Sequence, residues 1–354
     1  MVGRLERLRK GFQALDAGGI LLTDELSQRY LTDYAFTDGY VLITEQSAFL
    51  LTDFRYYEEA TAKVSGMTVV MPENYFIFIN DVLEREGIRN LCFEDGSLSY
   101  RETERIRELL TVSLVPAGEL LLSLRSVKEE GELDRIRRAQ TIADQAFSHI
   151  LKTLTPNMTE IEVALELEFF MRRNGAEGLS FETIAVSGSA SALPHGKCRN
   201  KKLEQGFLTM DFGCKVDGYC SDMTRTVVLG KATSKMKNVY KTVLQAQMAA
   251  LDFLEAGVSG AAADAVARGI IDKAGYAGCF GHGLGHGVGL YIHEMPRLSR
   301  LAKQTPLLAG SVVTVEPGIY LEGRFGCRIE DMGVLREGNF ENFTHSSKEL
   351  IELF

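Results

Sequence analysis

The sequence predicts two domains, an α/β domain over residues 1–122 and an α+β domain over residues 123–354. Three observations predict this organisation. The chain has 354 residues, and single domains usually have about 100–200. Strand-like and helix-like segments alternate in the first domain, which is typical of an α/β fold. All six histidines lie at or after position 149, so we expect any chemistry in the second domain.

The first domain is expected to begin with an amphipathic helix, because its apolar residues recur at helical spacing. These residues are Leu5, Leu8, Phe12 and Leu15. Short apolar runs predict strands over 18–24, 40–44, 47–53, 67–72 and 90–95, with helices between them that include 75–87 and 100–110. The sequence contains neither a P-loop nor a GxGxxG motif, so no nucleotide site is predicted.

The second domain is expected to open with a charged segment that becomes a long helix within residues 120–154. A second helix is predicted to begin at Thr159, because Thr159 and Glu162 form a capping box. Gly175 is expected to end it as a C′ glycine. Further helices are predicted over 239–254 and 261–274, and the remaining segments are expected to be mostly strands.

Composition and charge limit the class of protein. Hydrophobic residues make up 45% and charged residues 25% of the chain, as in an ordinary globular protein. The net charge is −9, whereas proteins that bind nucleic acid are usually basic. Six scattered cysteines without CxxC spacing indicate free thiols in a reducing compartment. No apolar run approaches the roughly 18 residues of a membrane span, so we expect a cytoplasmic protein that binds neither nucleic acid nor membranes.

A pair of aspartates lies on a predicted β-hairpin. Asp217-Gly218 is a strong signal for a two-residue turn. With that turn, Asp211 lies opposite Thr224, and Asp222 lies diagonally across from Asp211, roughly 7–8 Å away. Two carboxylates that converge in this way repel each other unless a cation lies between them. Two solvated aspartates on an exposed hairpin face are the alternative interpretation.

A glycine-rich segment contains three histidines and has glycine at every odd position from 281 to 289. In an extended chain this alternation strips one face of side chains, so another group can approach the backbone closely. His282 and His286 then project from the opposite face, and His293 follows. A zincin helix is excluded, because Pro296 breaks the helical pattern and no second histidine has the required spacing. Structural histidines among turn glycines are the alternative.

Two glutamates lie in or at the end of apolar strands. Glu316 ends one such strand, and Glu330 lies in another beside Arg328. Burying a carboxylate is costly unless it is paired or bound to a metal ion. An ion pair of Glu330 with Arg328 or Arg324 is the alternative to a metal site.

These motifs together supply four carboxylates and at least one imidazole on strands of one domain. That set of donors suits Mn²⁺, Fe²⁺, Co²⁺ or Zn²⁺ and does not suit a soft thiolate site. Four carboxylates are more than one metal ion usually needs, and they fit a two-metal centre.

The motifs resemble those of the pita-bread metallopeptidases, family M24, and within them most closely those of prolidases (Xaa-Pro dipeptidases) and Xaa-Pro aminopeptidases. The matching segments are DFGCKVDGYCSDMTRT (211–226), HGLGHGVGLYIHE (282–294), TVEPGIY (314–320) and GCRIEDMGVL (326–335). The resemblance covers most of the chain. It implies that residues 1–122 form the family's non-catalytic creatinase/prolidase-type domain and that residues 123–354 form the pita-bread catalytic domain.

The resemblance also implies a set of metal ligands. Asp211 would bind one ion. Asp222 and Glu330 would bridge two ions. His286 and Glu316 would complete the second site. The two divalent ions would be manganese, with cobalt, iron or zinc as alternatives.

Other residues take their implied roles from the same resemblance. His195 would lie near the scissile peptide, and His293 would stabilise the tetrahedral intermediate. Glu316 is the candidate general acid and base. His282 would contact the substrate, and Arg328 would support the ligands from outside the metal coordination.

The implied reaction is hydrolysis of the bond between an N-terminal residue and a following proline. Arg297 lies where prolidases have an arginine that looks like a clamp for the free carboxylate of a dipeptide, so we expect an Xaa-Pro dipeptidase that forms a homodimer. An Xaa-Pro aminopeptidase is the alternative enzyme class. For Arg297 itself, the alternative is a surface arginine in a polar loop.

Two other relatives fit less well. Methionine aminopeptidases typically have Arg in place of His286 and lack an extension as long as residues 1–122. A metal-free creatinase or pseudo-peptidase binding module would lack some of the five ligands, and none is missing from this sequence.

Overall fold

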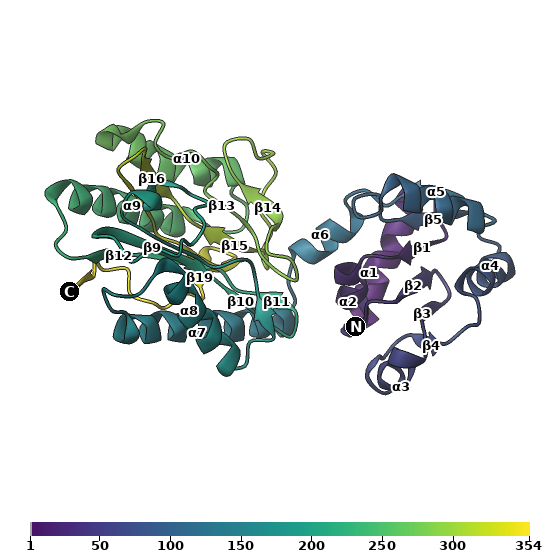
Figure 1. Ribbon diagram of the computed structural model, residues 1–354. Coiled ribbons are helices and arrows are strands. Elements are labelled where there is room, and N and C mark those ends of the chain that lie inside the picture. Colours follow the sequence, from purple (N-terminus) through teal and green to yellow (C-terminus); the bar gives the residue numbers. More distant parts are fainter. Residues whose placement is uncertain (1) are drawn as a thin grey trace. The chain divides into compact units, whose positions relative to one another are not determined.

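The computed structural model describes residues 2–354, and Figure 1 shows its helices and strands. The chain divides into two units, Met1–Arg125 and Ser126–Phe354, and each unit is described by itself. Within the described residues, no helix has both the length and the apolar character that crossing a membrane requires.

One mixed sheet forms the centre of the first unit, with strand order β4-β3-β2-β1-β5-β6. β2 runs antiparallel to β1 and β3, and the other neighbours are parallel. The strands are β1 (Gly19–Leu22), β2 (Gly39–Thr44), β3 (Ala48–Thr52), β4 (Thr68–Val70), β5 (Asn90–Phe93) and β6 (Ser113–Pro116). All five predicted strands are present. The sequence analysis missed β6, whose two end residues are exposed and whose apolar run is therefore short.

Helices alternate with these strands, which confirms the predicted α/β class. They are α1 (Val2–Phe12), the 3₁₀ turn η1 (Gln13–Leu15), α2 (Glu25–Thr32), α3 (Phe54–Lys63), α4 (Tyr75–Arg85), α5 (Tyr100–Leu109) and α6 (Leu120–Ser126). Leu5, Leu8 and Phe12, the positions that predicted α1, are buried. α3 was not identified from the sequence, and it buries only Ala60, so its apolar pattern is weak.

The second unit places strands between two pairs of helices (Figure 1), as expected of an α+β domain. The helices are α7 (Glu130–Thr153), α8 (Glu160–Arg173), α9 (Ser234–Phe253) and α10 (Gly260–Ile271), with short helical turns at η2 (Gly188–Ala192) and η3 (Asp272–Tyr276). The strand orders are β20-β12-β9-β8, β14-β13-β15-β18-β19, β11-β10-β7 and β16-β17.

The strands of this unit are short, and several carry residues of the predicted site. They are β7 (Gly178–Leu179), β8 (Ile184–Ser187), β9 (Gly206–Phe212), β10 (Cys214–Val216), β11 (Tyr219–Cys220), β12 (Met223–Leu229), β13 (Gly285–Gly287), β14 (Glu294–Leu298), β15 (Val312–Val315), β16 (Gly318–Leu321), β17 (Phe325–Arg328), β18 (Asp331–Arg336), β19 (Asn339–Asn342) and β20 (Glu352–Leu353).

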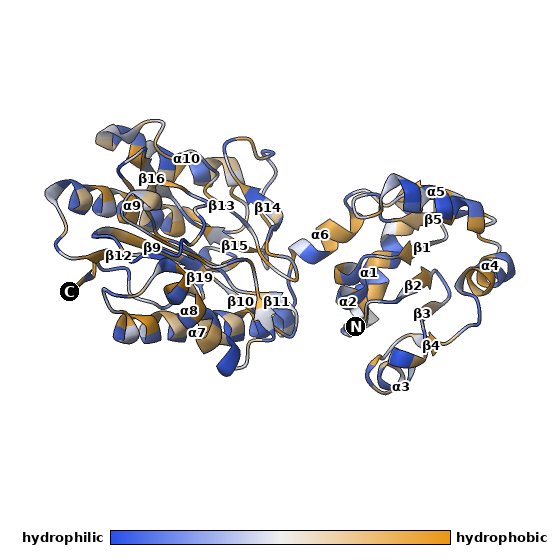
Figure 2. Ribbon diagram, in the orientation of Figure 1, coloured by the Kyte–Doolittle hydropathy of each residue, from blue (hydrophilic) through white to orange (hydrophobic). Residues whose placement is uncertain are grey.

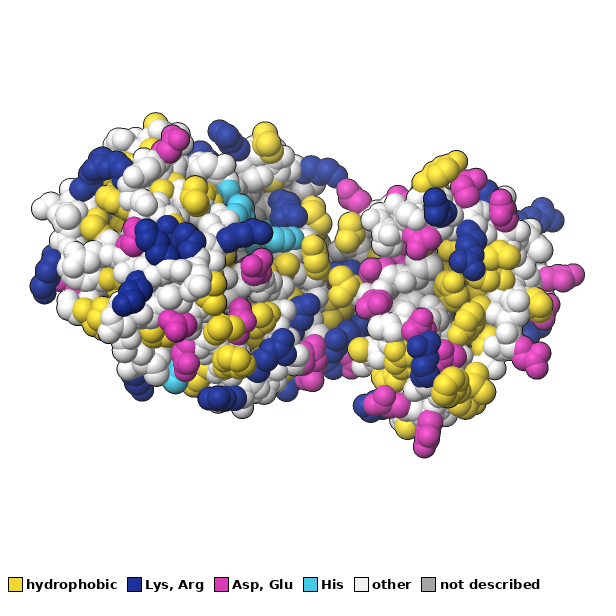
Figure 3. Space-filling model, viewed as in Figure 1, with side chains coloured by type: hydrophobic (Ala, Val, Ile, Leu, Met, Phe, Trp, Pro, Cys, Tyr) yellow, Lys and Arg dark blue, Asp and Glu magenta, His cyan; other side chains and the backbone are white. Residues whose placement is uncertain are grey.

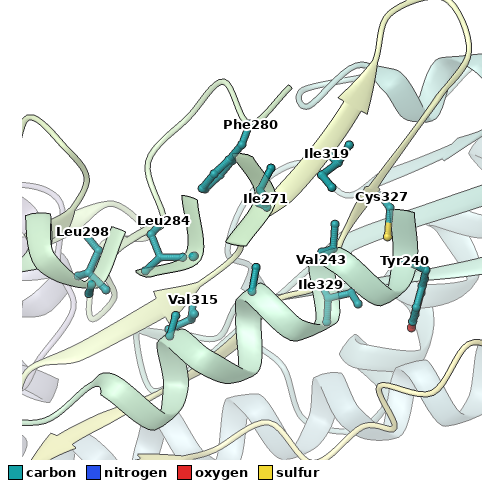
Figure 4. Close-up of a cluster of buried hydrophobic side chains, with 14 of the residues drawn as sticks. Tyr240, Val243, Ile271, Phe280, Leu284, Leu298, Val315, Ile319, Cys327 and Ile329 are labelled. Carbon is teal, nitrogen blue, oxygen red and sulfur yellow. The ribbon is translucent and has the colours of Figure 1, made fainter. Parts of the chain in front are cut away.

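Each helix pair packs on the strands through its own hydrophobic cluster. Phe147 of α7 and Leu167 of α8 pack with Phe212 of β9. Val243 of α9 and Ile271 of α10 belong to a second cluster, shown in Figure 4 together with residues of β15 and β16. β9 and β12 are strongly hydrophobic in Figure 2. Charged side chains among these strands are therefore held in a largely dry environment.

The helix boundaries follow local capping signals. Thr159 and Glu162 form the predicted capping box at the start of α8, and Gly175 follows its end with a φ of 104°. α9 begins earlier than predicted, because the side chain of Thr233 caps its N-terminus. The predicted helix over 261–274 ends at Ile271 and continues as the π-helical turn η3, which contains Gly275 at a φ of 88°.

The predicted hairpin around Asp217-Gly218 is confirmed. Both residues have positive φ angles, 48° and 86°, as a two-residue hairpin turn requires. β12 pairs with β9 so that Asp211 lies opposite Thr224. Asp222 directly precedes β12, so both aspartates reach the same end of this strand pair.

The glycine-rich segment forms β13 between β14 and β15. An added Cβ at Gly285 would collide with the carbonyl of Thr314, and one at Gly287 would collide with the carbonyl of Met295. The expected close approach of other groups is therefore confirmed for these glycines. Gly281 lies in open space, so the pattern does not extend to the start of the segment.

Candidate metal centre

A pocket of about 480 Å³ in the second unit brings all the predicted site residues together. Its lining includes His195, Asp211, Asp222, His282, His286, His293, Arg297, Glu316, Arg328 and Glu330. In Figure 3, histidine side chains (cyan) gather beside Lys and Arg side chains (dark blue) at a hollow on this unit. These residues come from separate segments of the chain. The segments meet at the pocket because β9, β12, β13, β14 and β17 all end or pass there.

The centre of the pocket is a group of carboxylates around one imidazole. His286 Nε2 lies 3.6 Å from Asp222 Oδ2 and 3.6 Å from Glu316 Oε1. One ligand atom each from Asp222, His286 and Glu330 lie within 4.8 Å of one another. These atoms converge closely enough to share a cation.

His286 is held in the form that binds metal. Its Nδ1 lies 3.1 Å from the carbonyl oxygen of Gly287, and a hydrogen bond donated there leaves the Nε2 lone pair facing the carboxylates. Burial lowers the pKa of His286 to about 3. A neutral imidazole is the form that metals bind.

The carboxylates are held close together against their repulsion. Burial, and after it repulsion by the charge of Glu330, raises the pKa of Asp222 well above its ordinary value. Burial and then Glu316 do the same to the pKa of Glu330. Burial also raises the pKa of Glu316, to about 8, against an opposing effect of Arg328. Among the described residues, the buried Oδ1 of Asp211 has no hydrogen-bond partner. A divalent cation would neutralise this cluster and satisfy that oxygen, so the residues present fit a divalent metal.

Arg328 supports the cluster from the side. Its guanidinium forms an ion pair with Asp211 Oδ2 at 2.6 Å, and its Nε donates to Thr224 Oγ1 at 3.0 Å. The Thr224 hydroxyl in turn donates to Glu330 Oε2 at 2.6 Å. Arg328 therefore orients the Asp211 carboxylate directly and the Glu330 carboxylate through Thr224. In the part of the chain that the structure describes, the ion pairs include neither Glu330–Arg328 nor Glu330–Arg324, the alternative to a metal site.

Tyr320 belongs to this network, and the sequence analysis missed it. Its Oη lies 2.8 Å from Arg328 Nη1 and 2.9 Å from His282 Nε2. His282 Nδ1 lies 2.8 Å from the carbonyl oxygen of Gly283, so both ring nitrogens of His282 have protein partners. No local pattern in the sequence marks Tyr320, because its partners Arg328 and His282 lie 8 and 38 residues away in the chain.

The mouth of the pocket carries basic and apolar side chains. His293 is exposed, and its ring centroid lies 4.5 Å from that of His286. Arg297 lies opposite His286 in the pairing of β13 with β14. His195 follows η2 and is also exposed. Apolar side chains that the sequence analysis did not identify also line the pocket: Phe181, Ile184 and Ile292.

Comparison with protein families agrees with this geometry. The model of metallopeptidase family M24 matches residues 134–337. The model of the creatinase/prolidase N-terminal domain matches residues 4–127. The second match covers the unit built on the six-stranded sheet, and the first covers the unit that holds the pocket.

Individual relatives span almost the whole chain. A solved structure named Xaa-Pro dipeptidase from Bacillus anthracis is 42% identical, covers 99% of both chains and has a TM-score of 0.97. A solved X-Pro aminopeptidase from Thermotoga maritima is 35% identical, with a TM-score of 0.91, and covers 97% of this chain and 100% of its own.

A further relative, named Xaa-Pro dipeptidase, from Pyrococcus horikoshii is 35% identical over 98% of this chain and 99% of its own. The family match, the full-length relatives and the carboxylate–histidine cluster lead to one assignment. The chain belongs to metallopeptidase family M24, with a creatinase/prolidase-type domain before its pita-bread domain.

Proposed function

We propose that this protein is an Xaa-Pro dipeptidase that works with two divalent metal ions. The main support is the position of Arg297 in the same pocket as the carboxylate–histidine cluster. A guanidinium there can hold the free carboxylate of a dipeptide with two parallel hydrogen bonds, and a dipeptide has that carboxylate immediately after its proline. The names of the Bacillus anthracis and Pyrococcus horikoshii relatives support the same substrate.

We assign the ligands as the motifs imply. Asp211 would hold one ion, Asp222 and Glu330 would serve both ions, and His286 and Glu316 would complete the second site. Manganese is the proposed ion, because carboxylates dominate the donor set. When bound, such ions polarise the peptide carbonyl and lower the pKa of water.

The chain's own residues bind the substrate and move protons. Glu316 acts as the general acid and base and passes a proton towards the leaving proline nitrogen. His293 donates a hydrogen bond to the oxyanion that develops on the peptide carbonyl. His195, which lines the same pocket, contacts the scissile peptide. His282, whose nitrogens already have partners, contributes a face of its ring to substrate contact.

The substrate class is tested by comparing kcat/KM for Ala-Pro, Ala-Pro-amide and Ala-Pro-Ala. The wild type should prefer Ala-Pro, and Arg297→Ala should remove that preference by lowering kcat/KM for Ala-Pro alone. Arg300→Ala, an exposed arginine outside the pocket, is the matched control and should change nothing. Equal cleavage of all three substrates, or an equal effect of Arg297→Ala on all three, would contradict the dipeptidase assignment.

An Xaa-Pro aminopeptidase is the second candidate, and the Thermotoga maritima relative favours it. That enzyme class acts on longer peptides, so the tripeptide would then be cut at least as well as the dipeptide. The same substrate comparison distinguishes the two candidates.

We further propose that residues 1–122 form a non-catalytic domain, that residues 123–354 form the catalytic domain, and that the protein works in the cytoplasm as a homodimer. The scattered cysteines support the location, because all six are free thiols, as is usual in a reducing compartment. The family resemblance supports the dimer.

A further inference from the structure

A buried ion pair lies next to the loop that carries His293. Lys128 Nζ lies 3.2 Å from Glu294 Oε2, and the two side chains are only 1% and 4% exposed. Neither residue lines the pocket. The pair therefore has no direct contact with a substrate bound there, and its role must be exerted through the loop.

The carboxylate of Glu294 is bound to the backbone of that loop. Its Oε1 accepts a hydrogen bond from the amide of Tyr291 at 3.1 Å. The amide of Gly289 donates to the carbonyl of Tyr291, also at 3.1 Å. A Cβ at Gly289 would collide with Glu294 Oε2, so only glycine lets the carboxylate lie this close. Glu294 thus closes the turn that presents Ile292 and His293 to the pocket.

Lys128 is itself held by a different part of the unit. Its amide donates to the carbonyl of Gly310 at 2.9 Å, and Val127 forms a β-bridge with Ser311, directly before β15. The ammonium also lies 3.4 Å from the carbonyl of Ser126. The cation is therefore fixed to the start of β15, the strand that leads to Glu316, while its partner carboxylate is fixed to the loop of His293.

Such a pair contributes more to geometry than to stability. The desolvation of two buried charges offsets most of their attraction, whereas removing one partner leaves an uncompensated buried charge. Without the Lys128 ammonium beside it, the Glu294 carboxylate would shift and release the Tyr291 amide. We propose that Lys128 is a positioning residue for His293, and that it acts through the Glu294 carboxylate and the Tyr291 amide.

This inference rests on the proposed function, in which His293 donates to the developing oxyanion. Misplacing a catalytic group by about 1 Å can cost about 10²-fold in rate. Lys128→Met should therefore lower kcat for Ala-Pro by about 10- to 100-fold, with a smaller change in KM. The metal stoichiometry measured by calorimetry should stay unchanged, because His293 is not a proposed ligand.

Amide hydrogen exchange measures the protection of the His293 loop independently of activity. In the metal-loaded full-length protein, exchange at residues 289–294 should be faster in Lys128→Met than in the wild type. Lys128→Arg, which keeps the charge, should restore part of both the protection and kcat. Ile150→Ala, a core truncation in α7 away from the pocket, is the control and should lower stability without lowering kcat.

Glu294→Gln and the double variant Lys128→Met/Glu294→Gln complete the test, and they remain informative where Lys128→Met alone does not fold. In the double variant, residue 294 carries no charge that Lys128 would have to offset, so this variant should regain part of the kcat that Lys128→Met loses. Losses that simply add in the double variant would show that Lys128 does not act through Glu294 and would overturn the inference. Unchanged amide exchange and unchanged kcat in Lys128→Met would also overturn the inference. A wild type that does not hydrolyse Ala-Pro would instead contradict the proposed function, while the exchange measurement would still decide the coupling.

Discussion

Thr224 links the Arg328 guanidinium to the Glu330 carboxylate in the pocket. Its hydroxyl accepts from Arg328 and donates to Glu330, so both of its hydrogen-bonding roles are used. The sequence identified the residues on either side of this relay as functional. It did not identify the relay, because the contact joins β12 with a segment about a hundred residues later in the chain, and spacing along the sequence reports only local geometry.

His293 is proposed to donate a hydrogen bond to the oxyanion that develops on the peptide carbonyl. His293→Ala should lower kcat for Ala-Pro by about 10²–10³, the usual cost of losing one oxyanion donor. The metal content should not change. His149→Ala is a suitable control, because His149 stacks on Phe170 and pairs with Glu166, away from the pocket. An unchanged kcat in His293→Ala would remove His293 from the mechanism.

At the scale of elements, α8 is fixed to the strands by a buried glutamate at its start. Glu160 accepts hydrogen bonds from the amide and hydroxyl of Ser187 on β8 at 2.7 and 2.9 Å. It also forms an ion pair with Arg199 at 2.6 Å. Burial raises the pKa of Glu160, but the hydrogen bonds from Arg199 and Ser187 outweigh it, and the net pKa is lowered.

This lowered pKa has a definite consequence for stability. A carboxylate whose pKa is lower in the folded state stabilises that state above its unfolded pKa, and the contribution is lost as the pH falls through the folded pKa. Glu160→Gln should therefore cost about 1–3 kcal/mol near pH 7. As the pH falls below 4.5, the ordinary pKa of a glutamate, the difference in Tm between variant and wild type should shrink. Thermal unfolding from pH 7 to pH 3 measures this, and a difference that stays constant with pH would contradict it.

The sequence predicted elements well where a local signal existed. The capping box at Thr159 and the Asp217-Gly218 turn were read directly, because each is complete within a few residues. The pairing of Lys128 with Glu294, 166 residues apart, has no local signal. Neither does the buried pair of Arg225 with Asp331. Long-range partners of this kind are decided by tertiary packing. The sequence therefore indicated the five candidate ligands, which lie in local motifs, but not contacts such as that of Lys128 with Glu294.

At the scale of the whole molecule, the proposed homodimer is open to direct measurement. Light scattering of the metal-loaded protein at micromolar concentration should give twice the chain mass of 39.2 kDa. The family resemblance predicts the dimer, whereas the composition gives no information about assembly. A mass equal to that of a single chain would refute the dimer.

Five residues of one pocket are proposed to hold two metal ions on which hydrolysis depends. Calorimetric titration of the metal-free protein with Mn²⁺, followed by assay of Ala-Pro hydrolysis, tests this proposal most directly. Two ions should bind per wild-type chain, and Asp222→Ala and Glu330→Ala should each lose metal and activity together, because each residue is proposed to serve both ions. Two bound ions and near wild-type turnover in either variant would contradict it.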